Sequence, residues 1–201
     1  TTTGLMHHCR SLRRWFDAAE APETLDGSHV DHVDWLRAVP FVAMHLACFG
    51  VIWVGVSTTA LAVAAALYAV RMFALTGFYH RYFSHKTFRT SRAVQFFFAV
   101  IGAACVQRGP LWWAAHHRNH HRNADTALDP HSPGVHGFLW SHMGWFLTPR
   151  AFRTELERVP DLAAYPELRW LDRYDIAVPI LLALMLYALG SVLNLAAPQL
   201  H

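Results

Sequence analysis

Two short stretches of the chain concentrate side chains that bind metal ions. The first holds His80 and His85 in the spacing HxxxxH, and the second holds His117, His120 and His121 in the spacing HxxHH. Imidazole nitrogen binds zinc, copper, iron and nickel, so the ligand type does not name the metal. Five such donors exceed the four ligands of a tetrahedral zinc site. The two motifs predict either a centre with two metal ions or a ligand set that is completed elsewhere.

The sequence lacks the carboxylate patterns of other metalloproteins. Soluble di-iron bundles place a His three residues after a Glu, and no glutamate in this chain has that spacing. The HExxH pattern of zinc proteases is also missing from the sequence. The residues therefore predict a histidine-rich centre without a glutamate bridge.

The spacing of the histidines indicates how helices would have to hold them. Positions i, i+3 and i+4 share one face of an α-helix, so His117, His120 and His121 can converge. His80 and His85 are five residues apart, which places them roughly 140° apart around a regular helix. We therefore expect the helix to end or bend between them, with one ligand on the helix end and one beyond it.

The composition indicates a membrane protein. Apolar residues make up 54% of the 201 residues and charged residues 15%, against about 25% charged residues in soluble domains. Residues 38–70 carry no charge, and as one helix they would be about 50 Å long, too long for a hydrocarbon core of about 30 Å. We predict a transmembrane hairpin over residues 38–79, with its turn near 55–59, and a third span over 176–200.

The remaining segments are polar and basic. Residues 1–37 form a polar N-terminal segment, within which residues 10–34 are too polar to belong to a signal peptide. Residues 93–107 are apolar but too short to span, so we expect an interfacial helix. Arginines near the apolar runs place residues 80–175 in the cytosol by the positive-inside rule. The pI near 9.0 therefore reflects topology, and we expect no nucleic-acid partner.

These observations predict an all-α integral membrane protein, in which a hairpin and a third span carry a cytosolic helical cap with the metal site. At the same residues the chain resembles the membrane-bound fatty acid desaturases, in particular bacterial relatives of the acyl-CoA Δ9 (stearoyl-type) enzymes. The resemblance covers roughly residues 35–189. The stretches that carry it are "TGFYHRYFSHKTF" (76–88), "GPLWWAAHHRNHHRNADT" (109–126), "DPHSP" (129–133), "GFLWSHMGW" (137–145) and "PDLAAYPELRWLDR" (160–173).

The resemblance implies O2-dependent insertion of a cis double bond into a long acyl chain at a centre of two iron ions. It also implies an electron-donor protein of the cytochrome b5 or ferredoxin kind. The site would face the cytoplasm in a multi-pass protein of the bacterial inner membrane. The family's first two histidine boxes fall on His80 and His85 and on His117, His120 and His121, which are therefore expected to be iron ligands.

Further residues near the boxes are candidates for supporting roles. Asp125 and Asp129 are expected to orient ligand rings or to act at helix ends and turns, and His116, His131 and His142 to support the site by hydrogen bonds. Trp112 and Trp113, with Trp140 and Trp145, are expected to line an acyl channel or to pack in a core. Arg118 and Arg122, together with Arg81 and Arg108, are expected to grip an anionic acyl carrier or lipid headgroups.

The chain departs from the family in lacking a third histidine box after a fourth span. This departure predicts that the sequence is a fragment or an inactive truncation, which alone binds iron weakly and makes no unsaturated product. A membrane di-iron hydroxylase acting on lipid or alkane and an inactive metal-binding remnant stay open as alternatives. The sequence leaves the acyl carrier open among CoA, carrier protein and lipid.

Overall fold

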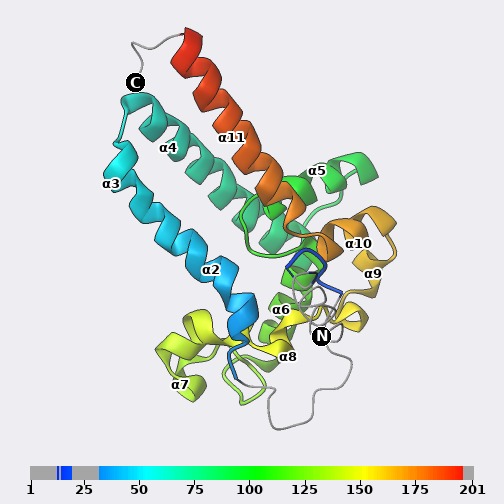
Figure 1. The fold of residues 1–201 in the computed structure, drawn as a ribbon. Coiled ribbons are helices and arrows are strands. Elements are labelled where there is room, and N and C mark those ends of the chain that lie inside the picture. Colours follow the sequence, from blue (N-terminus) through cyan, green and yellow to red (C-terminus); the bar gives the residue numbers. More distant parts are fainter. Residues whose placement is uncertain (1–12, 14, 20–31, 197–201) are drawn as a thin grey trace, which may run out of the picture.

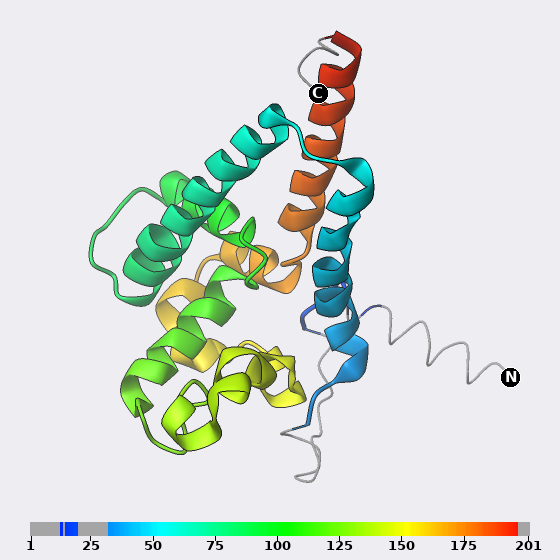
Figure 2. The ribbon, with the colours of Figure 1, turned by 90° about the vertical axis from the view of Figure 1, so that its left-hand side faces the viewer.

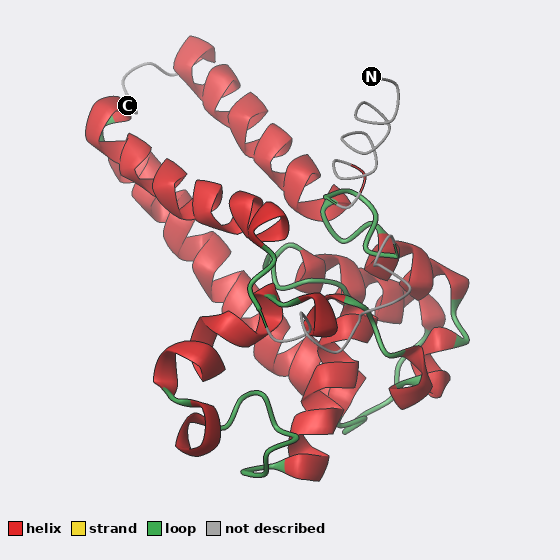
Figure 3. Ribbon diagram, turned by 60° about the horizontal axis from the view of Figure 1, so that its bottom comes forward, coloured by secondary structure: helices red, strands yellow, loops and turns green. Residues whose placement is uncertain are grey.

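The computed structural model describes residues 13, 15–19 and 32–196 of the chain. Every regular element within these residues is a helix, which confirms the all-α class (Figure 3). Most of the predicted polar segment 1–37, and residues 197–200 of the predicted third span, lie outside the described part. The described residues form a group of long apolar helices and a cap of shorter ones (Figures 1 and 2).

Three helical segments are long and apolar enough to cross a membrane. They are Trp35–Val54, which comprises α2 (Trp35–Ala47), η1 (Cys48–Gly50) and α3 (Val51–Val54); Thr58–Ser84, which comprises α4 (Thr58–Phe73) and the π-helical segment η2 (Ala74–Ser84); and α11 (Ala177–Ala196). No residue of α4 or α11 is buried. Such continuous exposure of apolar side chains is typical of a surface that faces lipid.

Local sequence signals explain where these helices begin. Asp34 and Ser57 precede α2 and α4, and their side chains accept hydrogen bonds from the backbone N–H groups of Arg37 and Ala60. Such N-caps satisfy donors that have no partner within the helix. Gly55 ends α3 with φ of 76°, a conformation that glycine adopts without strain. The helical segment that begins at Thr58 continues to Ser84, five residues beyond residue 79, where the predicted hairpin ends.

The cap packs around α5 (Arg92–Ala103) and α6 (Pro110–Asn123). Its shorter helices are α7 (Pro133–His136), η3 (Trp140–Gly144), η4 (Trp145–Leu147), α8 (Pro149–Phe152), η5 (Leu156–Arg158), α9 (Pro160–Ala163) and α10 (Pro166–Arg173). The core lies where η2, α5, α6 and α10 meet, and it includes the fully buried side chains of Tyr79, Phe83, Leu111, Leu168 and Leu171. This core joins the C-terminal end of the second long helix to the cap.

Helix α5 occupies most of the apolar segment predicted to lie at the membrane interface, but it ends at Ala103 rather than at residue 107. Its buried residues Gln95, Ala99 and Gly102 face the cap, whereas Phe97 on the opposite side is 57% exposed. The chain then turns through Val106, whose φ is 61°. The helix is therefore amphipathic, with one face in the core and one apolar face uncovered by the described residues.

Candidate metal centre

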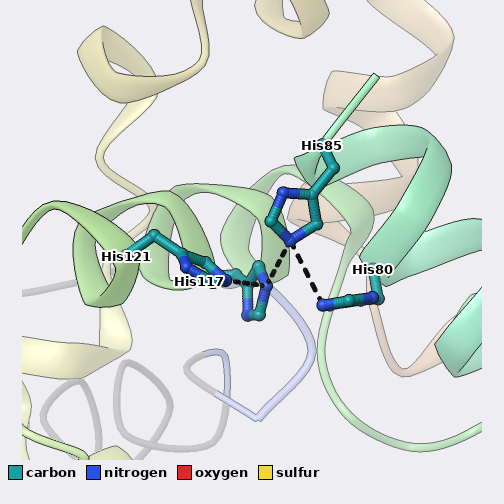
Figure 4. Close-up of side chains that lie close together, drawn as sticks. All are labelled: His80, His85, His117 and His121. Carbon is teal, nitrogen blue, oxygen red and sulfur yellow. Dashed lines mark hydrogen bonds between the residues drawn. The ribbon is translucent and has the colours of Figure 1, made fainter. Parts of the chain in front are cut away.

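Four histidines from two separate helices point toward one another (Figure 4). One ligand atom from each of His80, His85, His117 and His121 lies within 4.8 Å of the others. The Nε2 atom of His85 is 3.2 Å from Nε2 of His80 and 3.1 Å from Nε2 of His117, and Nε2 of His121 is 3.0 Å from Nε2 of His117. Among the described residues this is the one group of His, Cys, Asp and Glu side chains with the geometry of a metal site.

The π-helical turn of η2 brings His80 and His85 together. In a π-helix the backbone hydrogen bond joins residues i and i+5, and the N–H of His85 donates to the carbonyl of His80 at 3.1 Å. Each turn therefore takes up more residues than an α-helical turn, so residues five apart come to nearly the same side. His85 follows the last residue of η2, in agreement with the prediction that one ligand lies beyond the end of the helix.

Helix α6 supplies the other two histidines. His117 and His121 are four residues apart and lie on one face, so their rings meet at a centroid distance of 4.6 Å. His120 is on the same helix, yet it is not part of the group of four. Its Nδ1 lies 3.0 Å from both carboxylate oxygens of the fully buried Asp129. With Nδ1–H donated to Asp129, the lone pair of His120 is on Nε2, as in carboxylate–histidine–metal arrangements.

The electrostatics favour the neutral form of His117 and His85. Loss of solvent and the neighbouring His121, His80 and His85 lower the pKa of His117 to about 3. Loss of solvent and the adjacent His80 and His121 also lower the pKa of His85. A neutral imidazole has a free nitrogen lone pair, and that is the form that binds a metal ion.

Asp125 and His131 lie beside this arrangement in different ways. Asp125, with φ of 60°, accepts a hydrogen bond from the hydroxyl of Ser132 at 3.2 Å and stabilises a turn. The ring of His131 lies 5.5 Å from that of His120 and 4.3 Å from that of Trp145. Burial and the neighbouring His120 lower the pKa of His131.

His116 and His142 face a cavity next to the histidine group. Burial lowers the pKa of His116 to about 3, and its Nε2 has no hydrogen-bond partner in the described part of the protein. His142 stacks on Phe138 at a centroid distance of 5.5 Å. The cavity has a volume of about 540 Å³ and lies between α2, α6 and residues 140–147, with a largely apolar lining that also includes Phe41, Met44, Trp112, Trp113, His117, Met143 and Phe146.

Of the four tryptophans predicted to line a channel, Trp112, Trp113 and Trp145 border this cavity, whereas Trp140 does not. Trp113 stacks on the ring of His117 at 4.7 Å and donates its indole N–H to Gln107. Trp112 is buried, donates to the carbonyl of Ala151 at 2.7 Å, and stacks on Trp145. The cavity thus reaches the metal-site candidate through aromatic side chains on the same helix.

Two of the four arginines predicted to hold an anionic carrier, Arg118 and Arg122, have different surroundings. Arg118 makes five hydrogen bonds within the protein, so its guanidinium joins elements of the fold rather than facing a ligand. Arg122 is exposed and borders a second, more polar cavity of about 920 Å³, which His116, Arg150 and Arg158 also line. The role in carrier binding therefore stays a prediction for Arg122 and does not suit Arg118.

Two aspartates with strong contacts to this site had no role assigned from the sequence. Asp161 binds Arg118 and Lys86, and Asp172 binds the N-terminus of α6. Both are within the stretch 160–173 that carries the family resemblance. Their contacts span 43 or more residues of chain, and no local pattern reveals such a pairing.

Comparison with known proteins decides the family. Residues 57–201 match the family model described as "Fatty acid desaturase". The chain belongs to the fatty acid desaturase family. Its relatives include the sn-2 palmitoyl-lipid 9-desaturase of Nostoc sp. (strain 36), with 42% identity over 118 residues, which cover 56% of this chain and 41% of the relative. The sn-1 stearoyl-lipid 9-desaturase of Anabaena variabilis is 32% identical over 171 residues, which cover 84% of this chain and 62% of the relative.

These relatives act on different acyl carriers. An acyl-CoA 5-desaturase of Anemone leveillei is 37% identical over 129 residues, which cover 62% of this chain and 40% of that enzyme. The matched part of this desaturase thus spans between two fifths and about three fifths of the relatives' length. Family membership and the three apolar segments together indicate association with a membrane.

Proposed function

We propose that this desaturase contributes to the O2-dependent insertion of a double bond into a long-chain fatty acyl group at a histidine-ligated di-iron centre. The observation that carries the proposal is the convergence of His80, His85, His117 and His121. Acyl-lipid and acyl-CoA enzymes both occur among the relatives. A lipid-linked acyl chain desaturated at position 9 fits the two cyanobacterial relatives, and an acyl-CoA is the alternative substrate.

The donor set fits iron. Four imidazoles whose ligand atoms lie within 4.8 Å of one another can surround one ion, and imidazole suits iron. The Nε2 of His120, oriented through Asp129, is the expected ligand of a second ion. Bound iron would activate O2 for attack on an unactivated C–H bond, because such a bond offers no handle for acid–base chemistry.

The cavity beside His117 is the proposed binding site for the acyl chain. Its lining comes from apolar side chains of α2 and from aromatic side chains of α6, and such surfaces exclude water from a bound hydrocarbon. Trp113 contacts both the cavity and the ring of His117. This arrangement would present a methylene group to the metal centre while the cavity walls determine which one is presented.

The distribution of charge supports one orientation in the membrane. The turn between α3 and α4 carries no charge, whereas Lys86, Arg89 and Arg92 follow the other end of the long helix. By the positive-inside rule the histidine cluster then faces the cytoplasm, of a bacterial inner membrane under this proposal. An electron-donor protein of the cytochrome b5 or ferredoxin kind would reach the centre from that side.

The test expresses the full-length protein that carries this sequence in a host whose own desaturase gene is deleted. Fatty acids are analysed by gas chromatography with mass spectrometry, and iron is measured in the purified protein. We expect monounsaturated products and bound iron, both lost in His117→Ala and both kept in His32→Ala, a histidine far from the cluster in sequence. Hydroxylated products would indicate the alternative reaction, and full activity of His117→Ala would show that the centre is assigned wrongly.

A further inference from the structure

Arg118 lies next to a proposed ligand but points to the end of the neighbouring helix. It follows His117 on α6, and the two positions differ by roughly 100° around the helix. Its Nη2 donates to the carbonyl of Phe83 at 2.7 Å and its Nε donates to the carbonyl of Ser84 at 3.1 Å. These are carbonyls at the C-terminal end of η2, where backbone acceptors lack partners within the helix. Arg118 therefore connects α6 to the residue that directly precedes His85.

Asp161, on α9, also connects α6 to the C-terminal end of η2. Its carboxylate on α9 accepts two hydrogen bonds from Arg118, at 2.8 Å from Nη1 and 3.1 Å from Nη2. It also lies 2.9 Å from Nζ of Lys86, the residue that directly follows His85. Burial raises the pKa of Asp161, but hydrogen bonds from Arg118 and Lys86 outweigh it and hold the pKa at about 2. The carboxylate is therefore ionised at neutral pH and binds residues on both helical segments.

Apart from its ring contacts with the other histidines, His85 is held by hydrogen bonds to η2. Its ring is exposed, and its backbone N–H bonds to His80 in the last turn of η2. The next residue, Lys86, has φ of 54°, a conformation that a residue with a side chain adopts at some cost. The backbone N–H groups of Lys86 and Thr87 also donate to the carbonyls of Tyr82 and Arg81 at 3.1 Å. Arg118 and Asp161 make the contacts that tie both sides of His85 to α6 and α9.

We propose that Asp161 and Arg118 are positioning residues, which hold His85 in register with His117 and His121. The inference rests on the proposed metal centre. Asp161 contributes through its contacts with Arg118 and Lys86 and is not itself a proposed ligand. Residues that orient a metal ligand from outside the ligand set affect metal affinity by about 10- to 100-fold when they are changed.

The chain offers a matched control for the Arg118–Asp161 pair. Arg92 and Glu167 form a comparable two-bond pair, with both N···O distances at 2.7 Å. The hydrogen bonds of this pair join α5 to α10 and do not involve η2 or a ligand histidine. Loss of the control pair reports what the removal of one such ion pair does to the fold in general.

The experiment titrates Co²⁺ into the metal-free, detergent-purified full-length protein and records its visible absorption, which depends on coordination number. The variants are Asp161→Asn, Asp161→Glu, Arg118→Lys, Glu167→Gln and His117→Ala. We expect Asp161→Asn and Arg118→Lys to weaken Co²⁺ binding about tenfold and to change the spectrum toward fewer nitrogen ligands. Asp161→Glu, which keeps the carboxylate, should restore part of the affinity, and Glu167→Gln should match the wild type.

Hydrogen exchange of the metal-free protein tests the positioning separately from metal binding. In Asp161→Asn the amides of residues 85–87 should exchange faster, and in Glu167→Gln they should not. Unchanged affinity, spectrum and exchange in Asp161→Asn would overturn the inference, as would equal losses in Asp161→Asn and Glu167→Gln. Co²⁺ binding that survives His117→Ala would instead show that the proposed centre is wrong, even if exchange at residues 85–87 supports the positioning.

Discussion

Replacement of Asp172 tests how α6 is anchored at its N-terminus. The backbone N–H groups of Leu111 and Trp112 donate to one carboxylate oxygen of Asp172 at 3.0 and 2.8 Å, and the hydroxyl of Thr154 donates to the other at 2.6 Å. Asp172 thus caps a helix that lies 60 residues earlier in the chain. Asp172→Ala leaves two buried N–H groups without an acceptor, at a cost of about 1–3 kcal/mol each, or about 4 kcal/mol together.

The substitution also removes the unfavourable burial of the Asp172 carboxylate, which offsets part of this cost. Burial raises the pKa of Asp172 from its ordinary value of 3.8 to about 6. A group whose pKa is higher in the folded state stabilises the fold at low pH, and this stabilisation is lost as pH rises through about 6. With a pKa of 3.8 in the unfolded state and about 6 in the folded state, the burial of Asp172 lowers the free energy of unfolding by about 3 kcal/mol at pH 7.5 and by about 1.5 kcal/mol at pH 5.

The net destabilisation by Asp172→Ala is therefore expected to be about 1 kcal/mol at pH 7.5 and about 2.5 kcal/mol at pH 5. Asp172→Asn keeps an acceptor oxygen without the charge. Its free energy of unfolding, relative to that of the wild type, should therefore rise by about 1.5 kcal/mol between pH 5 and pH 7.5. Thermal unfolding in detergent micelles, followed by circular dichroism, measures both. At pH 5 the midpoint of Asp172→Ala should fall by about 5–10 °C.

Glu167 is the control, because it is a carboxylate on the same helix whose ion pair with Arg92 lies at the surface. Glu167→Ala should change the midpoint far less than Asp172→Ala does. A wild-type midpoint for Asp172→Ala at pH 5 would refute the capping role. If the difference in unfolding midpoint between the wild type and Asp172→Asn did not change with pH, the raised pKa of the buried Asp172 would be refuted.

Three further predictions concern the core, the second metal ion and the topology. Gly102→Ala should destabilise the fold by about 1–3 kcal/mol, because a Cβ would lie 2.0 Å from the Tyr79 ring, whereas Gly190→Ala, with nothing within 4 Å, should unfold like the wild type. Asp129→Asn should weaken the binding of the second iron ion about tenfold by removing the carboxylate that orients His120, and an unchanged iron affinity would count against His120 as a ligand. Cysteines at Arg89 and Asn123 should react with an impermeant label from the same side of the membrane, and labelling from opposite sides would rule out a shared centre.

The sequence by itself determined the helical class, the apolar segments and the family. These features are local, since a span needs only a run of uncharged residues and a capping residue acts on the next turn. The paired spacings HxxxxH and HxxHH were sufficient to predict metal chemistry at His80, His85, His117, His120 and His121, and the structure groups all of these but His120. The assignment of these residues and of His120 to iron stays a prediction.

Tertiary structure decided how the two motifs meet. In an α-helix, residues five apart point in different directions. His85 lies close to His80 because η2 forms a hydrogen bond between residues i and i+5. The roles of Asp161 and Asp172 were equally hidden, because their partners lie 43 and about 60 residues away along the chain. A hydrogen bond between such distant residues depends on the packing of η2, α6 and α10 around one core, and spacing within a single helix carries no information about that packing.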